Sequence, residues 1–253
     1  DSAAGCDGAV DNASGIAILL ELAARLSKQR LQHNVEFVAS GAEEFGGEDF
    51  CGQGAKAHFQ RQTGELEKII ACFEIDHVGD RLGVRRLRAW GSRRFLNDIP
   101  VGDGFLLDLH RPVGGDGGAA YRFGLPSVSM TDKFIAAPYY HTSADTIDIV
   151  DFNAIETAVE VGIKIVSNLC RTDGYYRYIR EGNVLVRPAR ETDIERICEI
   201  TREAFGPYST DRMREEFFQV KLGGLNWWEH KLASVRDFVV QYMDWVVVAE
   251  VDG

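Results

Sequence analysis

Apolar residues along the first 170 positions follow two spacings, one typical of helices and one typical of strands. Helical spacing predicts helices over 15–28, 49–60 and 151–170, and short apolar runs predict strands over 34–40, 69–75, 105–109 and 127–130. Ser14 stands where it can cap the first helix. Because strands and helices alternate, we expect residues 1–172 to form an α/β domain with a mainly parallel mixed sheet flanked by helices.

The pattern changes after residue 172. Residues 173–182 are polar and aromatic without periodicity, and we interpret them as a linker. A strand is predicted over 183–187, and a helix follows from Thr192 to Phe205, with Glu195 completing a capping box. A strand is also predicted near the end, over 245–251. We therefore expect a second, incomplete α/β domain over residues 183–253.

Composition narrows the function classes. The chain has 253 residues, with 28 basic against 39 acidic side chains and a net charge of -11. This balance argues against a nucleic-acid partner. No apolar run approaches the roughly 20 residues that span a bilayer. The five cysteines are odd in number and form no Cys-x-x-Cys pair, which fits reduced thiols and a reducing compartment such as the cytoplasm.

Acidic residues and one histidine stand at the ends of predicted elements. Asp11 precedes the first helix, Glu43-Glu44 follows a strand, Asp76 ends a strand, and His141 lies in a polar loop. In open α/β sheets, ligands bind at the carboxyl ends of the strands. Carboxylates with an imidazole suit zinc, manganese or cobalt, and a pair of such ions needs a bridging carboxylate and a base that is not a ligand. Adjacent glutamates can divide these two roles.

Commonplace roles remain open for each of these residues taken alone. Asp11 is also a suitable helix cap, and Glu43-Glu44 would ordinarily be solvated loop charges. We expect the side chain of His77 to face the opposite side of its strand from Asp76. The glycine-rich stretch 114–118 lacks the Lys-Ser/Thr of a phosphate loop and is interpreted as a flexible active-site loop.

Five segments occur in one order: Asp-Ser at residues 1–2, then GAVDNASG, SGAEEFGG, IDHVG and YYHTSADT. Together they resemble the two-zinc aminopeptidases of metallopeptidase family 28 over about residues 1–170. The resemblance implies a zinc exopeptidase-like fold and these roles: Asp11 as bridging carboxylate, Glu43 as general base, Glu44 and His141 as ligands of one zinc, Asp76 as ligand of the other, and Asp1 behind a ligand histidine. We place Asp116 of the glycine-rich stretch behind the ligands as well.

One ligand of this set is absent from the sequence. The family's His-X-Asp motif places its histidine two positions before Asp1. We therefore expect the zinc site of Asp11, Glu44 and His141 to have all its protein ligands and the site of Asp11 and Asp76 to lack its imidazole. The implied activity is removal of the N-terminal residue from a peptide or amino-acyl substrate. We expect the chain as it stands to hold one of the two zinc ions and to be inactive.

The second region has a resemblance of its own. Residues 184–194 (VLVRPARETDI) resemble the opening of GNAT-type N-acetyltransferases. Acetyl-CoA is implied only for a complete domain of that kind, because the sequence ends before a pyrophosphate loop. Three hypotheses stay open: an aminopeptidase fused to an acetyltransferase-like domain, an acetyltransferase with a non-catalytic peptide-binding domain, and a glutaminyl-cyclase-like acyl transferase.

Overall fold

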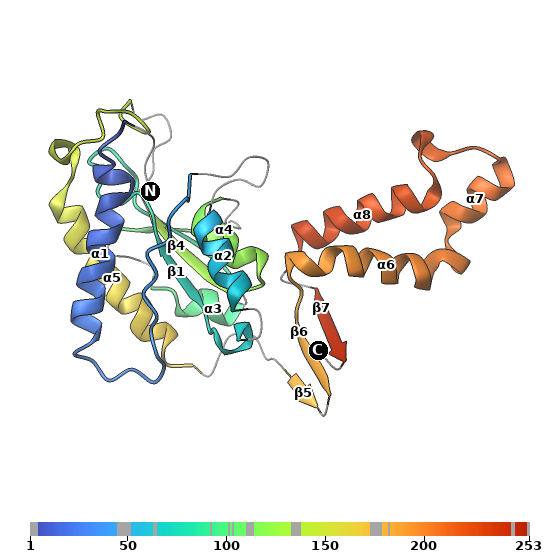
Figure 1. Cartoon of the computed structure of the whole chain (residues 1–253), viewed down its shortest axis with the longest axis horizontal. Coiled ribbons are helices and arrows are strands. Elements are labelled where there is room, and N and C mark those ends of the chain that lie inside the picture. Colours follow the sequence, from blue (N-terminus) through green and yellow to red (C-terminus); the bar gives the residue numbers. More distant parts are fainter. Residues whose placement is uncertain are drawn as a thin grey trace. The chain divides into compact units, whose positions relative to one another are not determined.

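The computed structural model divides the chain into two compact units, residues 1–176 and 177–253. They are coloured along the sequence in Figure 1. The described residues are 5–44, 52–62, 65–91, 93–100, 102, 104–109, 114–132, 138–172, 179–181, 183–243 and 246–251. Among them, no helix is long and apolar enough to cross a membrane. Asp1 lies outside the described residues, so its predicted role stays a prediction.

The first unit contains a mixed four-stranded sheet in the order β1-β4-β2-β3. Its strands are β1 (Cys72–Ile75), β2 (Arg86–Trp90), β3 (Leu106–Asp108) and β4 (Ser127–Thr131). β1 is parallel to β4 and β2 is parallel to β3, whereas β2 and β4 are antiparallel. Every residue of β4 is buried because it lies between two other strands and under helices. The α/β class with a mixed sheet is thereby confirmed.

Helices cover the sheet on both sides. The helices are α1 (Ser14–Leu26), α2 (Gln53–Arg61), α3 (Arg93–Asp98), α4 (Gly115–Arg122) and α5 (Phe152–Leu169). Figure 1 shows α1 and α5 together on one side and α2 with α4 on the other. Ile18, Leu22 and Ile165 belong to the larger apolar core, and Phe59 with Leu125 to a second one. A Cβ at Gly162 would lie 3.1 Å from Leu22, so glycine lets α5 approach α1 closely.

Three predictions for the first unit were wrong. Residues 34–40 belong to no strand, since a strand needs a hydrogen-bonded neighbour and, among the described strands, β1 pairs with β4 alone. The Ser14 hydroxyl donates to the Val10 carbonyl and does not cap α1. The glycine-rich stretch 114–118 is the start of α4. Strand β2 and helices α3 and α4 were not predicted.

Short turns complete the first unit. A five-residue π turn spans Ala9–Ala13, with non-helical backbone at Asp11 and Asn12. Single 3₁₀ turns span Leu66–Lys68 and Ile147–Ile149. The π turn leads directly into α1, so it fixes Asp11 at the N-terminal end of a helix whose inner face is buried.

In its described residues, the second unit has an antiparallel sheet in the order β5-β6-β7 and three helices. Its elements are β5 (Ile179–Glu181), β6 (Val184–Pro188), α6 (Ile194–Phe205), α7 (Thr210–Phe218), α8 (Trp227–Gln241) and β7 (Val247–Val251), with 3₁₀ turns at Glu191–Asp193, Gly206–Tyr208 and Leu222–Gly224. β5 lies inside the predicted linker. The predicted Thr192 cap is also wrong: α6 follows Asp193, whose carboxylate accepts the N–H of Arg190.

Candidate metal centre

Three side chains from distant parts of the sequence converge beside the N-terminal end of α1. His141 Nε2 lies 2.8 Å from Glu44 Oε1 and 3.1 Å from Asp11 Oδ2. One ligand atom of each residue lies within 4.8 Å of the others. Asp11 is only 3% exposed, whereas Glu44 and His141 are half-buried. Asp11 is therefore the buried member of the group, and solvent can reach Glu44 and His141.

Asp11 is held by a carboxylate that the sequence analysis missed. Asp145 Oδ1 accepts the N–H of Val10 at 2.8 Å, and Oδ2 accepts the N–H of Asp11 at 3.0 Å. Asp145 lies four residues after His141 and is fully buried. One segment thus supplies an imidazole and also clamps the turn that carries Asp11. Its place within the YYHTSADT segment was the only sequence signal for this role.

His141 is presented by a turn. Its φ of 56° lies in the left-handed region, where histidine is found more often than most residues. The ring stacks on Tyr140 with a centroid distance of 3.8 Å. The Thr142 hydroxyl donates to the carbonyl of Tyr139 and closes the same turn. These contacts fix the direction in which Nε2 faces Asp11 and Glu44.

Glu43 lies beside this group and has a strongly perturbed carboxyl. Its pKa is raised to about 8, first by burial and then by neighbouring carboxylates, which are those of Asp76, Glu44, Asp116 and Glu74. A carboxyl group whose pKa lies near the working pH is better suited to taking up and returning a proton than an ordinary glutamate. The environment therefore suits Glu43 for transferring protons.

The carboxylate of Glu74 also lies close to Glu43. Glu74 of β1 accepts hydrogen bonds from the N–H of Gly117, at 2.7 Å, and from the Ser129 hydroxyl. Its pKa is raised to about 7, mainly by burial. A Cβ at Gly115 would lie 2.7 Å from Glu74 Oε1 and 3.4 Å from Glu43 Oε1. Glycine at this position, with φ of 70°, therefore lets α4 begin against both carboxylates.

Asp116 and Asp76 flank the same cluster. Asp116 accepts a hydrogen bond from the Ser40 hydroxyl, and burial raises its pKa. Asp76 directly follows β1, and its N–H donates to the carbonyl of Met130 at 3.0 Å. Among the described residues, the group with metal-compatible spacing contains Asp11, Glu44 and His141 and does not include Asp76. The structure therefore brings three of the four predicted ligands together.

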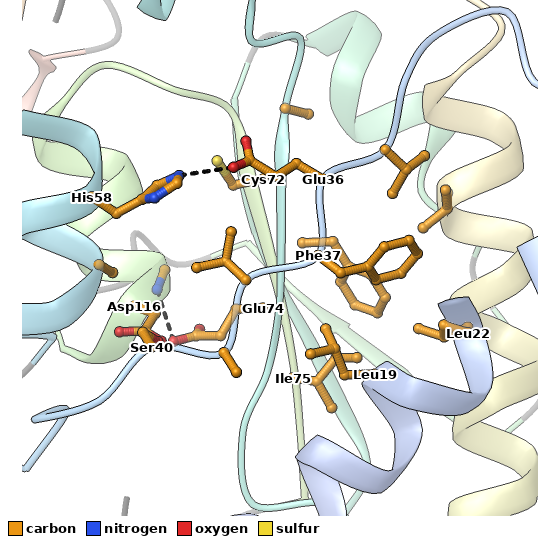
Figure 2. Close-up of a pocket in the computed structure, with 18 of the residues that line it drawn as sticks. Leu19, Leu22, Glu36, Phe37, Ser40, His58, Cys72, Glu74, Ile75 and Asp116 are labelled. Atoms are coloured by element: carbon orange, nitrogen blue, oxygen red, sulfur yellow. Dashed lines mark hydrogen bonds and ion pairs between the residues drawn. The ribbon is translucent and has the colours of Figure 1, made fainter. Parts of the chain in front are cut away.

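The carboxylates lie on the wall of a cavity of about 530 Å³ between residues 34–40 and β1. Figure 2 shows its two ends. Polar side chains gather at one end, where Glu36 forms an ion pair with His58 at 3.9 Å. At the other end the labelled side chains are apolar: Leu19, Leu22, Phe37 and Ile75. This cavity occupies the space that a strand pairing between 34–40 and β1 would close.

The converging donors suit a transition metal. One imidazole and two carboxylates are three protein ligands, the number at catalytic zinc sites that keep one position open. Tetrahedral ligands at about 2.0–2.2 Å from zinc lie roughly 3.3–3.6 Å apart. His141 is 2.8 and 3.1 Å from its two partners, so small outward movements would create that spacing. The residues present therefore fit a zinc ion.

Comparisons with known proteins give a family match for part of the chain and similar folds. Residues 1–97 match the family model described as Peptidase family M28. No sequence among the curated proteins matches the chain. The fold is similar to that of an aminopeptidase from Aneurinibacillus sp. strain AM-1, with 24% identity, a TM-score of 0.57 and coverage of 72% of this chain and 44% of that one.

Two further solved structures share the fold. One is a zinc aminopeptidase from Bacillus subtilis, at 22% identity and a TM-score of 0.54, which covers 66% of this chain and 43% of that chain. The other is the LapA aminopeptidase of Legionella pneumophila, at 20% identity and a TM-score of 0.53, covering 66% and 48%. The chain thus spans less than half the length of each of these proteins. At these identities the likeness shows the fold alone.

Proposed function

We propose that the first unit is the catalytic part of a zinc-dependent aminopeptidase. Asp11, Glu44 and His141 would hold one zinc ion, Asp11 and Asp76 would contribute to a second, and Glu43 would be the general base. The observation that carries this proposal is the convergence of an imidazole and two carboxylates beside a glutamate whose pKa is raised to about 8. The match of residues 1–97 to Peptidase family M28 supports it.

The chain's own residues account for the proton transfers. Zinc supplies Lewis acidity toward a carbonyl oxygen and lowers the pKa of water when it is bound at such a site. The Glu43 carboxylate then accepts a proton from the attacking water and delivers it to the nitrogen of the leaving amine. Burial and the neighbouring carboxylates raise its proton affinity for the first of these steps.

The substrate is a peptide or amino-acyl compound with a free α-amino group. The carboxyl groups of Glu43, Glu74 and Asp116 form an acidic surface on the wall of the cavity, and a nearby cation favours their charged forms despite the raised pKa values. An α-ammonium group is attracted to such a surface, whereas an acylated N-terminus is not. Selection for chain ends follows from this difference in charge.

Two measurements test the proposal. Zinc content is measured on the chain itself, where one ion per chain is expected. Hydrolysis of an amino-acyl p-nitroanilide is measured after a His-Ala dipeptide is added before Asp1, which supplies the imidazole that the resemblance requires. There, Glu43→Gln should lower kcat by about 10²–10⁴-fold with zinc retained.

The matched control is Glu36→Gln, which alters an exposed carboxylate on the wall of the same cavity. It should leave zinc content and kcat unchanged. A chain that takes up no zinc, or a Glu43→Gln variant as active as its parent, would overturn the proposal. Binding of peptide N-termini without turnover would instead favour the peptide-binding hypothesis, and cyclisation of an N-terminal glutamine would favour the glutaminyl-cyclase-like one.

For residues 183–253 we propose the beginning of an N-acetyltransferase-like domain. The proposal depends on the resemblance of residues 184–194, and the order of β6 followed by α6 is compatible with it. The match to the peptidase family ends at residue 97, so it does not bear on this unit. Calorimetry with acetyl-CoA on a longer protein that contains this chain would test it, and absence of binding there would contradict it.

A further inference from the structure

His77 lies at the back of the candidate metal centre, although the sequence pattern placed its side chain away from it. The residue follows Asp76 directly, and its side chain is fully buried. Its φ of 53° turns the backbone into the left-handed region. This turn explains the wrong prediction: strict alternation of side chains applies only while the backbone stays extended. The ring consequently faces the same region as the ligands.

The His77 ring lies between two buried carboxylates. Nδ1 is 4.0 Å from Asp11 Oδ2, and Nε2 is 4.0 Å from Asp80 Oδ2. Both carboxylates are at most 5% exposed. Tyr139 and Tyr140 lie against the ring, with centroids at 6.3 and 5.4 Å. The imidazole is therefore enclosed on all the sides for which contacts are known, and one of its nitrogens faces a candidate metal ligand.

Asp80, on the other side of the His77 ring from Asp11, is held in place by hydrogen bonds to the backbone. Asp132, at the end of β4, accepts hydrogen bonds from the N–H groups of Gly79 and Asp80, at 2.8 and 3.1 Å. Asp80 itself accepts the N–H of Leu82 at 2.7 Å. The N–H of Asp132 donates to the carbonyl of His77 at 3.1 Å. The loop that carries His77 is thus tied to the end of β4, an inner strand of the sheet.

The backbone of His77 is also hydrogen-bonded to the turn that carries Asp11. The backbone N–H of His77 donates to Asn12 Oδ1 at 3.3 Å, and Asn12 Nδ2 donates to the carbonyl of Ile75 at 3.0 Å. Asn12 therefore connects the end of β1 with the turn that presents Asp11. A displacement of the His77 ring would act on the very carboxylate that faces His141.

From this arrangement we propose that His77 is a positioning residue for the metal centre: its imidazole lies between the anchored Asp80 and Asp11 and orients the Asp11 carboxylate toward the ion. The inference rests on the proposed function, because it assumes that Asp11 binds metal. Groups behind a ligand restrict its orientation, and their loss typically lowers metal affinity by about 10–100-fold. His77 needs no direct bond to the ion for this effect.

Titration with Co²⁺ tests the proposal, since the visible d–d bands of bound Co²⁺ report ligand geometry independently of activity. Three substitutions separate polarity from shape. His77→Phe removes both nitrogens, His77→Asn keeps an amide N–H near the position of Nδ1, and His77→Gln keeps one near the position of Nε2. His58→Phe is the control, because His58 is a half-buried histidine on α2 beside Glu36. Thermal unfolding of the metal-free proteins monitors folding.

We expect His77→Phe to weaken Co²⁺ binding by about 10–100-fold and to change the band shape. His77→Asn should retain more affinity than His77→Gln, because its amide faces Asp11, and His58→Phe should behave like the parent. If His77→Phe does not fold, the Asn and Gln variants still decide. Parent-like affinity and spectrum in His77→Phe, or equal affinities for His77→Asn and His77→Gln, would overturn the positioning role alone. A parent chain that binds no Co²⁺ would overturn the proposed function and this inference together.

Discussion

The two units treat buried charge in opposite ways. In the first unit, Glu43, Glu74 and Asp132 are carboxyl groups whose pKa values burial raises to about 8, 7 and 7. In the second unit, Arg187 is only 3% exposed, and its guanidinium binds two carboxylates, with Nη1 and Nη2 at 2.7 and 2.9 Å from Asp193 and a further bond to Glu250. Like charges gather in one unit, and opposite charges pair in the other.

This difference separates two uses of buried charge. A paired guanidinium compensates its desolvation within the fold, so its role is structural. A cluster of carboxyl groups raises the free energy of the fold unless protons or a cation compensate it, and such clusters occur at functional sites. The contrast therefore points to the first unit as the place of the chemistry. Four predictions test how far it holds.

The largest effect is expected at the candidate metal centre. Glu44→Gln removes one of three converging ligands. Zinc affinity should fall by at least about 100-fold, since even a group behind a ligand accounts for about 10–100-fold. Competition with a chromophoric chelator measures it. Glu250→Gln in the second unit is the control and should bind zinc like the parent. Equal zinc affinities for the two variants would contradict the assignment of the metal centre to the first unit.

Arg187→Met should destabilise the second unit by about 2–3 kcal/mol. It leaves Asp193 and Glu250 without their shared cation, and removing one partner of a buried ion pair costs ~3–5 kcal/mol. The loss expected here is smaller than that range because solvent reaches the two carboxylate side chains, which are 16% and 34% exposed. Urea unfolding followed by far-ultraviolet circular dichroism measures it. The combined change of Asp193→Asn and Glu250→Gln in the Arg187→Met background should recover part of the loss, and no recovery would argue against the pairing.

The stability of the first unit should depend on pH through the buried carboxyl group of Asp132. Burial raises the pKa of Asp132 from its ordinary value of 3.8 to about 7. The folded chain therefore keeps a proton that the unfolded chain releases, and stability falls as pH rises from about 4 to 7. Asp132→Asn should make this decline shallower by up to about 1.4 kcal/mol per pH unit, the value for one proton. Unfolding at stepped pH checks it. An unchanged slope would contradict the raised pKa.

The smallest effect concerns helix caps and compares the units directly. Asp151 caps α5 by accepting N–H groups of Asn153 and Ala154 at 3.0 and 3.3 Å. Ser209 caps α7 through one longer bond, from Arg212 at 3.4 Å. Asp151→Ala should cost about 1 kcal/mol, and Ser209→Ala should fall nearer the lower end of the usual range, about 0.5 kcal/mol. Chemical denaturation measures both, and a reversed order would show that bond geometry does not set the cost.

Much of the fold was predictable, and the failures have physical causes. The long amphipathic helices were confirmed as α1 and α5, and the buried strand over 127–130 as β4, because helical spacing and dense apolar runs are local signals. The strand over 34–40 failed, since a strand also depends on a partner. Helix α4 was missed because the glycines that let it approach Glu74 resemble a loop in sequence.

The candidate site divides in the same way. The sequence motifs by themselves determined which residue types stand at the ends of elements, among them Asp11, Glu44 and His141. Only the tertiary structure decided that these three meet within 4.8 Å and that Asp145 clamps the turn of Asp11. It also decided that the His77 side chain faces the candidate metal centre, whereas alternation along the strand predicts the opposite side. The reason is physical: side-chain chemistry is a property of each residue, whereas distance and burial depend on segments that are far apart in sequence and packed together in space.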